Sequence, residues 1–319
     1  MSIIAPGEFL PVHFIDKNRE GCYIKRYQMM FPLVERRNDM SKPIVAIMYD
    51  FDKTLCTRDM QEYTFIPSVG MEPHEFWNHT AEVAAQEVMD SILTYLYCMV
   101  ETAKQSGNPL TRDSLVACGK DIEYHPGVEG WFERINRYAE EAGVQVEHYV
   151  LSSGLKEIIE GTSIAKYFKR IYACEFLYKD GQACWPKMAV NYTNKTQFVY
   201  RINKGVLDIN NDADLNSSRP DSEKRVFFSN MIYLGDGLTD VPCMKLVKQS
   251  GGHSIAIYHP GQHDKTLPLL KHERVDFMFE ADYNEGSELD RTMKLLLEKL
   301  SYYNKLKALN EEQKKEFQK

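Results

Sequence analysis

The sequence predicts an α/β protein built on a doubly wound (Rossmann-like), mainly parallel sheet. Two apolar runs, 44–49 and 231–234, show no polar alternation, which is typical of strands covered by helices on both faces. From residue 128 onward, segments with helical spacing alternate with short strand-like runs, as in doubly wound folds. The 319 residues, 43% hydrophobic and 27% charged, suffice for one large core and a smaller second unit.

The N-terminal part of the chain predicts one strand followed by helices. Residues 1–42 have no clear period and are assigned only as a leader of unknown structure. After the strand at 44–49, apolar residues recur at three- and four-residue steps from 73 to 105, which predicts helix. Further helical sequence runs to about residue 122, and the segment 124–127 then turns the chain.

The remainder of the chain predicts alternating helices and strands. A helix from Val128 ends at Gly143, and a strand at 146–151 follows it. Residues 208–225 are acidic and rich in Asn and Ser, so we expect a solvated loop inserted before the next strand. The other expected elements are a helix from about Leu155, a strand at 170–174, a turn at 178–181, a helix after Lys195, strands at 231–234 and 254–258, and a charged helix at 290–319.

Both apolar runs end in acidic residues. Asp50 and Asp52 follow the first run, and they point to the same side because side chains in a strand alternate with a period of two. Asp236 and Asp240 follow the second run beside glycines, which permit a sharp turn and close approach of the backbone to a ligand. An ordinary acidic turn is the alternative for the first motif taken alone.

The four acids predict a metal site. In open α/β sheets the carboxyl ends of the strands form the crevice in which ligands bind, so Asp50, Asp52, Asp236 and Asp240 are expected to converge there. Converging carboxylates repel one another unless a cation neutralises them. A cluster of hard oxygen ligands suits Mg²⁺, which is therefore the expected cofactor.

These motifs resemble those of a known family. Residues 50–54, DFDKT, are similar to the first motif of the haloacid dehalogenase (HAD) superfamily of aspartyl-phosphate hydrolases, and residues 235–240, GDGLTD, to its fourth. Ser152, after the strand at 146–151, matches the second motif, and the resemblance implies that Ser152 and Ser153 bind phosphate. Without the family, Ser152 also fits the N-cap of the following helix.

The resemblance further implies a lysine near the start of a helix, and the chain offers two. Lys195 follows Thr193 and Asn194, which are suitable N-cap residues. Lys204 precedes Gly205 and fits the other end of the same helix. We choose Lys195, because a side chain at the helix start can reach the strand ends, and keep Lys204 as the alternative.

The resemblance also implies a domain organisation. The helical block lies where part of the family inserts a cap, so the expected α/β core is 43–59 with 126–319, and the expected cap is 60–125. This helical arrangement looks similar to that of phosphoserine-phosphatase-like members. Four residues that lead into the cap are candidates for contact with the substrate, with a solvated linker as the alternative. They are Arg58, Gln61, Glu62 and Tyr63.

The activity implied by the resemblance is Mg²⁺-dependent hydrolysis of a phosphate monoester through a phosphoaspartate. Asp50 is the expected nucleophile, and Asp52 the proton donor and acceptor, with its backbone carbonyl on the metal. Asp52 argues against a dehalogenase. A phosphomutase or other phosphotransferase, and a non-catalytic phosphate-binding protein on the same fold, remain alternatives.

Composition limits the partners. The formal net charge of −7 and the lack of lysine clusters interleaved with aromatics disfavour nucleic acid, so a small phosphorylated metabolite is the expected partner. No stretch approaches the roughly 20 apolar residues of a membrane span, and a cytoplasmic location is expected. Seven scattered cysteines suggest reduced thiols, with Cys56 packed rather than reactive. The sequence does not define the substrate or the oligomeric state.

Overall fold

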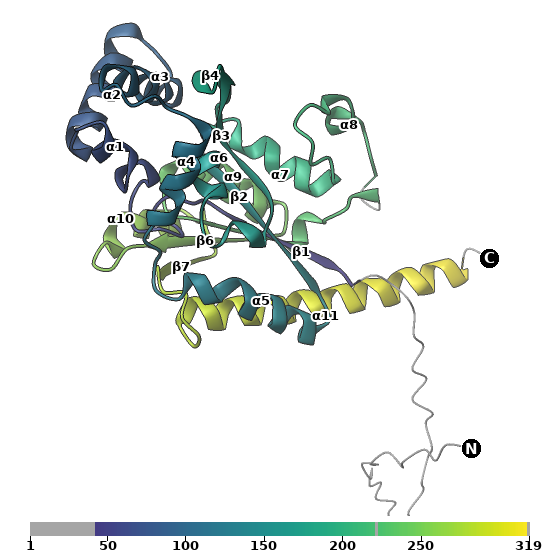
Figure 1. Ribbon diagram of the computed structural model, residues 1–319. Coiled ribbons are helices and arrows are strands. Elements are labelled where there is room, and N and C mark those ends of the chain that lie inside the picture. Colours follow the sequence, from purple (N-terminus) through teal and green to yellow (C-terminus); the bar gives the residue numbers. More distant parts are fainter. Residues whose placement is uncertain (1–41, 221–222, 318–319) are drawn as a thin grey trace, which may run out of the picture. The chain divides into compact units, whose positions relative to one another are not determined.

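The computed structural model describes residues 42–220 and 223–317. This part of the chain forms a seven-stranded sheet in the order β4-β3-β2-β1-β5-β6-β7 (Figure 1), parallel at every pair except β3 and β4. The predicted doubly wound, mainly parallel sheet is therefore confirmed. The strands are β1 (Ile44–Tyr49), β2 (Gln145–Leu155), β3 (Phe168–Lys179), β4 (Gln182–Met188), β5 (Met231–Gly235), β6 (His253–Tyr258) and β7 (Phe277–Glu280).

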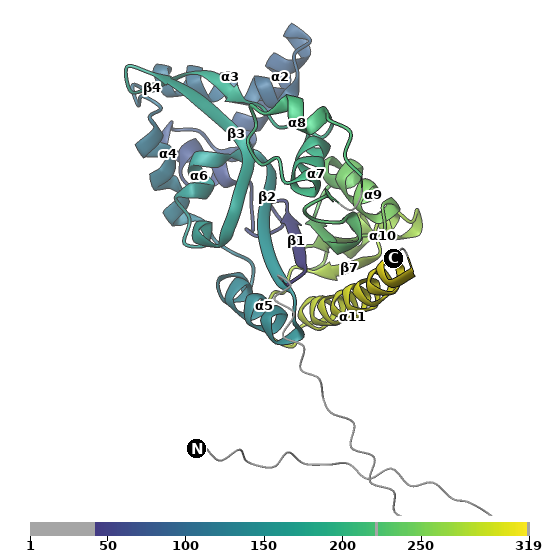
Figure 2. The same cartoon turned by 90° about the vertical axis from the view of Figure 1, so that its right-hand side faces the viewer.

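Helices cover both faces of this sheet. Figure 2 shows α5 and α11 on one side of the sheet and α7 and α9 on the other, so the central strand β1 is buried. The helices are α1 (Phe65–Ser68), α2 (Pro73–Glu87), α3 (Ser91–Gln105), α4 (Arg112–Cys118), α5 (Val128–Ala142), α6 (Lys156–Glu160), α7 (Lys195–Lys204), α8 (Asp212–Asn216), α9 (Val241–Gln249), α10 (His263–Lys271) and α11 (Glu288–Phe317). Among the described residues, no helix is both long and apolar enough to cross a membrane.

The helical region expected from 73 to 105 is divided into two helices. Helix α2 ends where Val88 adopts a left-handed conformation, with φ of 51°. Asp90 then begins α3, because its side chain accepts hydrogen bonds from the backbone N–H groups of Ile92 and Leu93. An aspartate at this position satisfies two N–H groups that have no partner inside the helix.

The turn expected at 178–181 connects an antiparallel hairpin that the sequence did not predict. Asp180 and Gly181 both have positive φ, 51° and 78°, as in the two-residue turns that match the twist of a hairpin. They join β3, which is longer than the expected strand at 170–174, to β4 at the edge of the sheet. The strand expected at 254–258 is also not the last one, because α10 and β7 follow it.

The segment 208–225 is not merely the solvated loop that its composition predicted. It contains α8, and the buried Arg201 guanidinium donates to the backbone oxygens of Asp208 at 2.7 Å and Ile209 at 3.0 Å. Arg201 also pairs with the Asp212 carboxylate at 2.6 Å. Arg201 of α7 therefore anchors the first part of this insertion. Residues 221–222, like residues 1–41 of the expected leader, lie outside the described part of the chain.

A buried polar network lies between β1, β2 and α5. Trp131 Nε1 donates to the Tyr49 hydroxyl oxygen at 2.9 Å, and this hydroxyl lies 3.1 Å from His148 Nδ1. His148 Nε2 lies 3.0 Å from Asn136 Oδ1. Because the amide oxygen can only accept, the imidazole proton is assigned to Nε2, and the Tyr49 hydroxyl donates to Nδ1. Every member of the network thus has a partner without a charge on the imidazole.

Candidate active site

Two neighbouring strands bring the acidic residues together. Asp50 directly follows β1, and Asp236 directly follows β5, the parallel neighbour of β1. The Asp50 backbone N–H donates to the Leu234 carbonyl at 2.9 Å, which extends this pairing to the strand ends. Carboxylate oxygens of Asp50, Asp236 and Asp240 lie within 4.8 Å of one another. The crevice beyond the sheet therefore holds a three-carboxylate cluster drawn from distant parts of the sequence.

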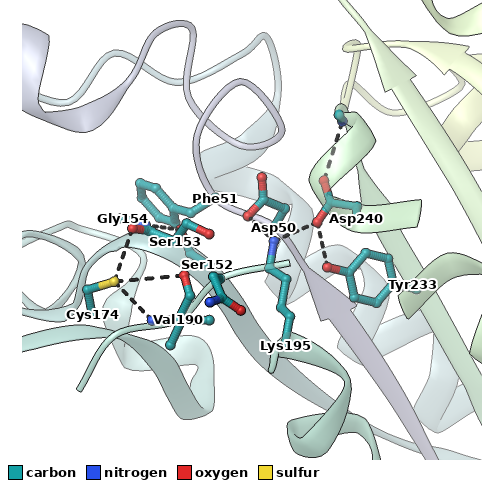
Figure 3. Close-up of polar contacts among 12 residues, drawn as sticks. Asp50, Phe51, Ser152, Ser153, Gly154, Cys174, Val190, Lys195, Tyr233 and Asp240 are labelled. Atoms are coloured by element: carbon teal, nitrogen blue, oxygen red, sulfur yellow. Dashed lines mark hydrogen bonds and ion pairs between the residues drawn. The ribbon is translucent and has the colours of Figure 1, made fainter. Parts of the chain in front are cut away.

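Lys195 reaches this cluster from the start of α7. Its ammonium Nζ lies 2.9 Å from Asp50 Oδ1 and 2.6 Å from Asp240 Oδ1 (Figure 3), and the side chain is buried. The alternative, Lys204, lies at the other end of α7 and donates to the backbone oxygens of Leu215 and Ser217. Of the two candidate lysines, only Lys195 contacts the carboxylates.

The loop before Lys195 differs from the expected N-cap. Neither Thr193 nor Asn194 caps α7 with its side chain. The Asn191 side-chain oxygen instead accepts from the backbone N–H groups of Thr193 and Asn194 at 3.1 and 3.0 Å, an Asx-type turn. This turn fixes the direction in which α7 begins and therefore the place that Lys195 reaches.

Asp240 is held in position by two groups that the sequence analysis did not single out. The Tyr233 hydroxyl donates to Asp240 Oδ1 at 2.7 Å, and the Gly237 N–H donates to Oδ2 at 3.3 Å. Gly235 allows the close approach, because a Cβ atom there would lie 2.6 Å from Asp240 Cγ. The apolar run gave only a weak signal for Tyr233, since a tyrosine within a buried strand is equally typical of packing.

The cluster carries more negative than positive charge. Burial and the Asp240 carboxylate raise the pKa of Asp50 to about 7, although Lys195 opposes the shift. Burial, Asp50 and Asp240 also raise the pKa of Asp236 well above its usual value. The two carboxylates that flank Lys195 raise its pKa despite its burial, so the lysine stays charged. The Lys195 ammonium contacts Asp50 and Asp240, while Lys53 opposes the pKa shift of Asp236. This set of three hard oxygen ligands fits a divalent cation such as Mg²⁺.

The side chain of Asp52 lies outside the three-carboxylate cluster, so the expectation of four converging carboxylates is wrong for this residue. Asp52 Oδ1 accepts from the Met60 backbone N–H at 2.8 Å. Burial, followed by the carboxylates of Asp59 and Asp50, raises the pKa of Asp52 well above its usual value. A carboxyl group that retains its proton near neutral pH is suited to donate it. Asp59, which the sequence analysis did not consider, forms an ion pair with Lys53 at 2.5 Å.

The second motif lies against Asp52. Ser152 is fully buried, and its hydroxyl oxygen accepts from the Gly154 N–H at 2.9 Å. A Cβ atom on Gly154 would lie 2.7 Å from Asp52 Oδ2, so glycine permits this approach. The Ser153 carbonyl accepts from the Cys174 thiol at 3.2 Å (Figure 3). Ser152 does not cap the following helix, because the N-cap of α6 is Leu155.

The four candidates for substrate contact have different surroundings. The Tyr63 hydroxyl accepts from the Arg58 backbone N–H at 2.8 Å, and the Arg58 guanidinium lies 4.3 Å from the centre of the Tyr63 ring. Glu62 accepts from Trp77 Nε1 at 2.8 Å. Gln61 is buried, and its Oε1 has no hydrogen-bond partner among the described residues. Gln61 is therefore the one candidate whose buried side-chain oxygen is left without a partner among the described residues.

Cys56 is packed, as expected. Its side chain is buried, and burial together with the Asp52 carboxylate raises the pKa of the thiol well above its usual value. A thiol of this kind stays protonated and is a poor nucleophile.

Comparison with known proteins identifies the family. A family model for haloacid dehalogenase-like hydrolases matches residues 47–245, and the chain therefore belongs to this family. An uncharacterised protein of Borreliella burgdorferi is 26% identical over 274 residues, which cover 77% of this chain and 94% of that protein.

Comparison with solved structures also finds hydrolases. The crystal structure of a HAD family hydrolase from Salmonella enterica serovar Typhi has a TM-score of 0.51 and 16% identity, over 80% of this chain and 72% of that one. A phospho-aspartyl intermediate analogue of phosphoserine phosphatase has a TM-score of 0.49 and 17% identity, over 80% of this chain and 99% of that one.

Proposed function

We propose that the protein is a Mg²⁺-dependent phosphatase that hydrolyses a small phosphorylated metabolite, a phosphate monoester, through a phosphoaspartate. The observation that carries this proposal is the position of Asp50, whose carboxylate lies 2.9 Å from Lys195 Nζ and within 4.8 Å of the Asp236 and Asp240 carboxylates. A carboxylate nucleophile beside fixed positive charge is the arrangement that phosphoryl transfer requires.

In the proposed reaction, an Asp50 carboxylate oxygen attacks phosphorus while the bond from phosphorus to the leaving oxygen breaks. Asp52 gives its proton to that oxygen, then accepts a proton from the water that hydrolyses the phosphoaspartate. Ser152, Ser153 and Lys195 bind the phosphoryl oxygens, with Lys195 as a point charge against developing negative charge.

Asp50, Asp236 and Asp240 would hold the Mg²⁺, together with the Asp52 backbone carbonyl. When bound, the cation neutralises negative charge on the phosphoryl group and on the three carboxylates. A phosphomutase would use the same residues but would transfer the phosphoryl group to a second hydroxyl of its substrate instead of to water.

A panel of phosphate monoesters, assayed with Mg²⁺ and with EDTA, tests the proposal. We expect Mg²⁺-dependent release of inorganic phosphate, lowered on the order of 1,000-fold or more in Asp50→Asn, because the amide is not a nucleophile. Asp264→Asn is the matched control, since the side chain of Asp264 is 99% exposed and distant in sequence from the motifs. Near-normal turnover by Asp50→Asn would exclude this nucleophile, and transfer of phosphate within the substrate would favour a phosphomutase.

A further inference from the structure

Helix α11 has two apolar faces. One consists of buried side chains, Leu289, Met293, Leu296, Leu297 and Leu300, where α11 packs against α5 and β7. The other consists of exposed side chains, which we call the outer stripe. Its members are Leu295 at 64% exposure, Tyr302 at 66%, Leu306 at 67%, Leu309 at 57% and Phe317 at 91%.

The members of the outer stripe lie along one side of the helix, with Lys299 and Gln313 between them. Its members are separated by seven, four, three and eight residues, so at 3.6 residues per turn they lie along one line on the side opposite the buried face. The stripe from Leu295 to Phe317 is about 33 Å long at 1.5 Å per residue. Single exposed apolar residues are ordinary on a protein surface, whereas the steps of seven, four and three residues from Leu295 to Leu309 have coiled-coil spacing and indicate a partner helix.

The position of α11 leaves the outer stripe accessible. The buried side chains of this helix end at Ser301, while the helix continues to Phe317 (Figure 1, yellow). Because the buried face and the outer stripe lie on opposite sides, a helix laid along the stripe does not meet the sheet behind α11. The high exposures show that no described residue covers the stripe.

Charges beside the stripe indicate which partner fits. Lys305 and Glu312 are seven residues apart, on the same flank of the stripe, and neither forms an ion pair within the described residues. When two copies of α11 run antiparallel about a twofold axis, like flanks face each other. Lys305 of each copy then lies opposite Glu312 of the other, with Leu306 and Leu309 at the centre.

A parallel pair lacks this complementarity. In a parallel arrangement, Lys305 would face Asn310 of the other copy, and Glu312 would face Phe317. We propose that the outer stripe from Tyr302 to Phe317 is the interface of a homodimer in which two α11 helices pack antiparallel. The active-site residues lie on other elements, so this inference goes beyond the proposed function and does not depend on it.

Sedimentation of the full-length protein over a range of concentrations tests the inference. We expect a dimer for the natural protein and a monomer for Leu306→Glu/Leu309→Glu, since two charges at the centre of the interface oppose association. Leu177→Glu, at another exposed leucine, is the matched control and should remain dimeric. The circular dichroism spectrum and phosphoester turnover of each variant show whether it is folded.

Exchange of charges tests the antiparallel arrangement. Lys305→Glu and Glu312→Lys should each raise the dimer dissociation constant about tenfold, because each places like charges opposite one another, and the double variant should restore it to within about threefold. A natural protein that is monomeric at every concentration would overturn the proposal. Residues 1–41 or a different protein would then be the candidates to cover the stripe. A dimer that persists in Leu306→Glu/Leu309→Glu would also overturn it. So would a Lys305→Glu/Glu312→Lys variant whose dissociation constant remains as high as that of the single variants.

Discussion

At the scale of single residues, the active site holds a reactive carboxylate whose negative charge destabilises the fold. Burial and the neighbouring Asp240 carboxylate raise the pKa of Asp50 to about 7, although Lys195 opposes the shift. A raised carboxylate pKa means that the ionised form destabilises the folded protein. The penalty is absent at pH values well below 3.8, grows as the pH rises above 3.8, and is complete above about pH 7.

Asp50→Asn should therefore be more stable than the natural protein while being inactive. In EDTA at pH 8, we expect its free energy of unfolding to be higher by on the order of 1 to 3 kcal/mol, because an amide has no charge to desolvate. Urea unfolding measures the difference. At pH 4.5, where Asp50 is largely protonated in the folded state, most of this gain in stability should be lost. Mg²⁺ at pH 8 should also reduce the gain. A loss of stability at pH 8 would show that the Lys195 pair outweighs burial.

The sequence predicted the site residues that carry charge and not those that hold them. Asp50, Asp236 and Lys195 stand where apolar runs stop or helices begin, so their positions follow from local patterns. Tyr233 orients Asp240, and Asp59 raises the pKa of Asp52. These effects depend on distances between side chains, which a single sequence does not show.

At the scale of elements, helix α3 joins both segments proposed to bind phosphate. The Tyr95 hydroxyl donates to the Ser153 carbonyl at 2.6 Å, and Asp90, at the start of α3, accepts from the Asn191 side chain at 3.4 Å. Asn191 forms the turn before Lys195. The expected cap therefore contacts, through one helix, the peptide beside Ser152 and the loop that directs Lys195.

Tyr95→Phe should weaken substrate binding more than it slows the reaction. The change removes only a hydroxyl, and the Ser153 carbonyl keeps the Cys174 thiol as a donor. We expect KM to rise about 3- to 10-fold with kcat lowered less than about threefold, and stability to fall by about 1 kcal/mol, the usual contribution of one hydrogen bond. Steady-state kinetics with Tyr97→Phe as control provide the comparison, because Tyr97 lies on the same helix and is 50% exposed. Equal KM values for both variants would show that the bond does not position Ser153.

Elements with ordinary patterns were predicted, and irregular ones were not. The helices at 128–142 and after Lys195 have clear apolar spacing and end at glycines with positive φ. Strand β4 was missed because Pro186, in an edge strand, breaks the pattern of a strand. Helix α10 contains Pro268, and the insertion at 208–225 is ordered by Arg201 from another element. Composition within a segment cannot show such an anchor.

At the scale of the whole molecule, the alternation of helices and strands was sufficient to predict the sheet, but not the polar groups inside its core. His148 lies on β2, within the strand predicted at 146–151, and the Tyr49 and Asn136 side chains satisfy its two nitrogens. Burial lowers the pKa of His148 to about 3, so the folded protein holds this imidazole neutral. The stability of the core therefore depends on pH through a residue distant from the active site.

The direction of this dependence follows from the two pKa values of His148. The unfolded chain takes up a proton near pH 6.5, whereas the folded protein does so only near pH 3. The contribution of His148 is therefore complete above about pH 6.5 and falls as the pH decreases toward 3, by about 1.4 kcal/mol per pH unit. Asp50, with its raised pKa, has the opposite effect over part of the same pH range. The pH dependence of the natural protein's stability alone therefore does not separate the contribution of His148 from that of Asp50.

The difference in free energy of unfolding between the natural protein and His148→Gln does isolate the contribution of His148, because the active-site carboxylates are common to both. Glutamine can accept from Tyr49 and donate to Asn136 but does not titrate. We expect the stability of the natural protein relative to His148→Gln to decrease by roughly 2 to 3 kcal/mol between pH 7 and pH 4.5, measured by urea unfolding. His263→Gln, whose original side chain is 53% exposed, should show no such trend. A difference for His148→Gln that stays constant over this range would mean that the folded protein accepts the proton on His148 as readily as the unfolded chain, and that the buried network tolerates a charge.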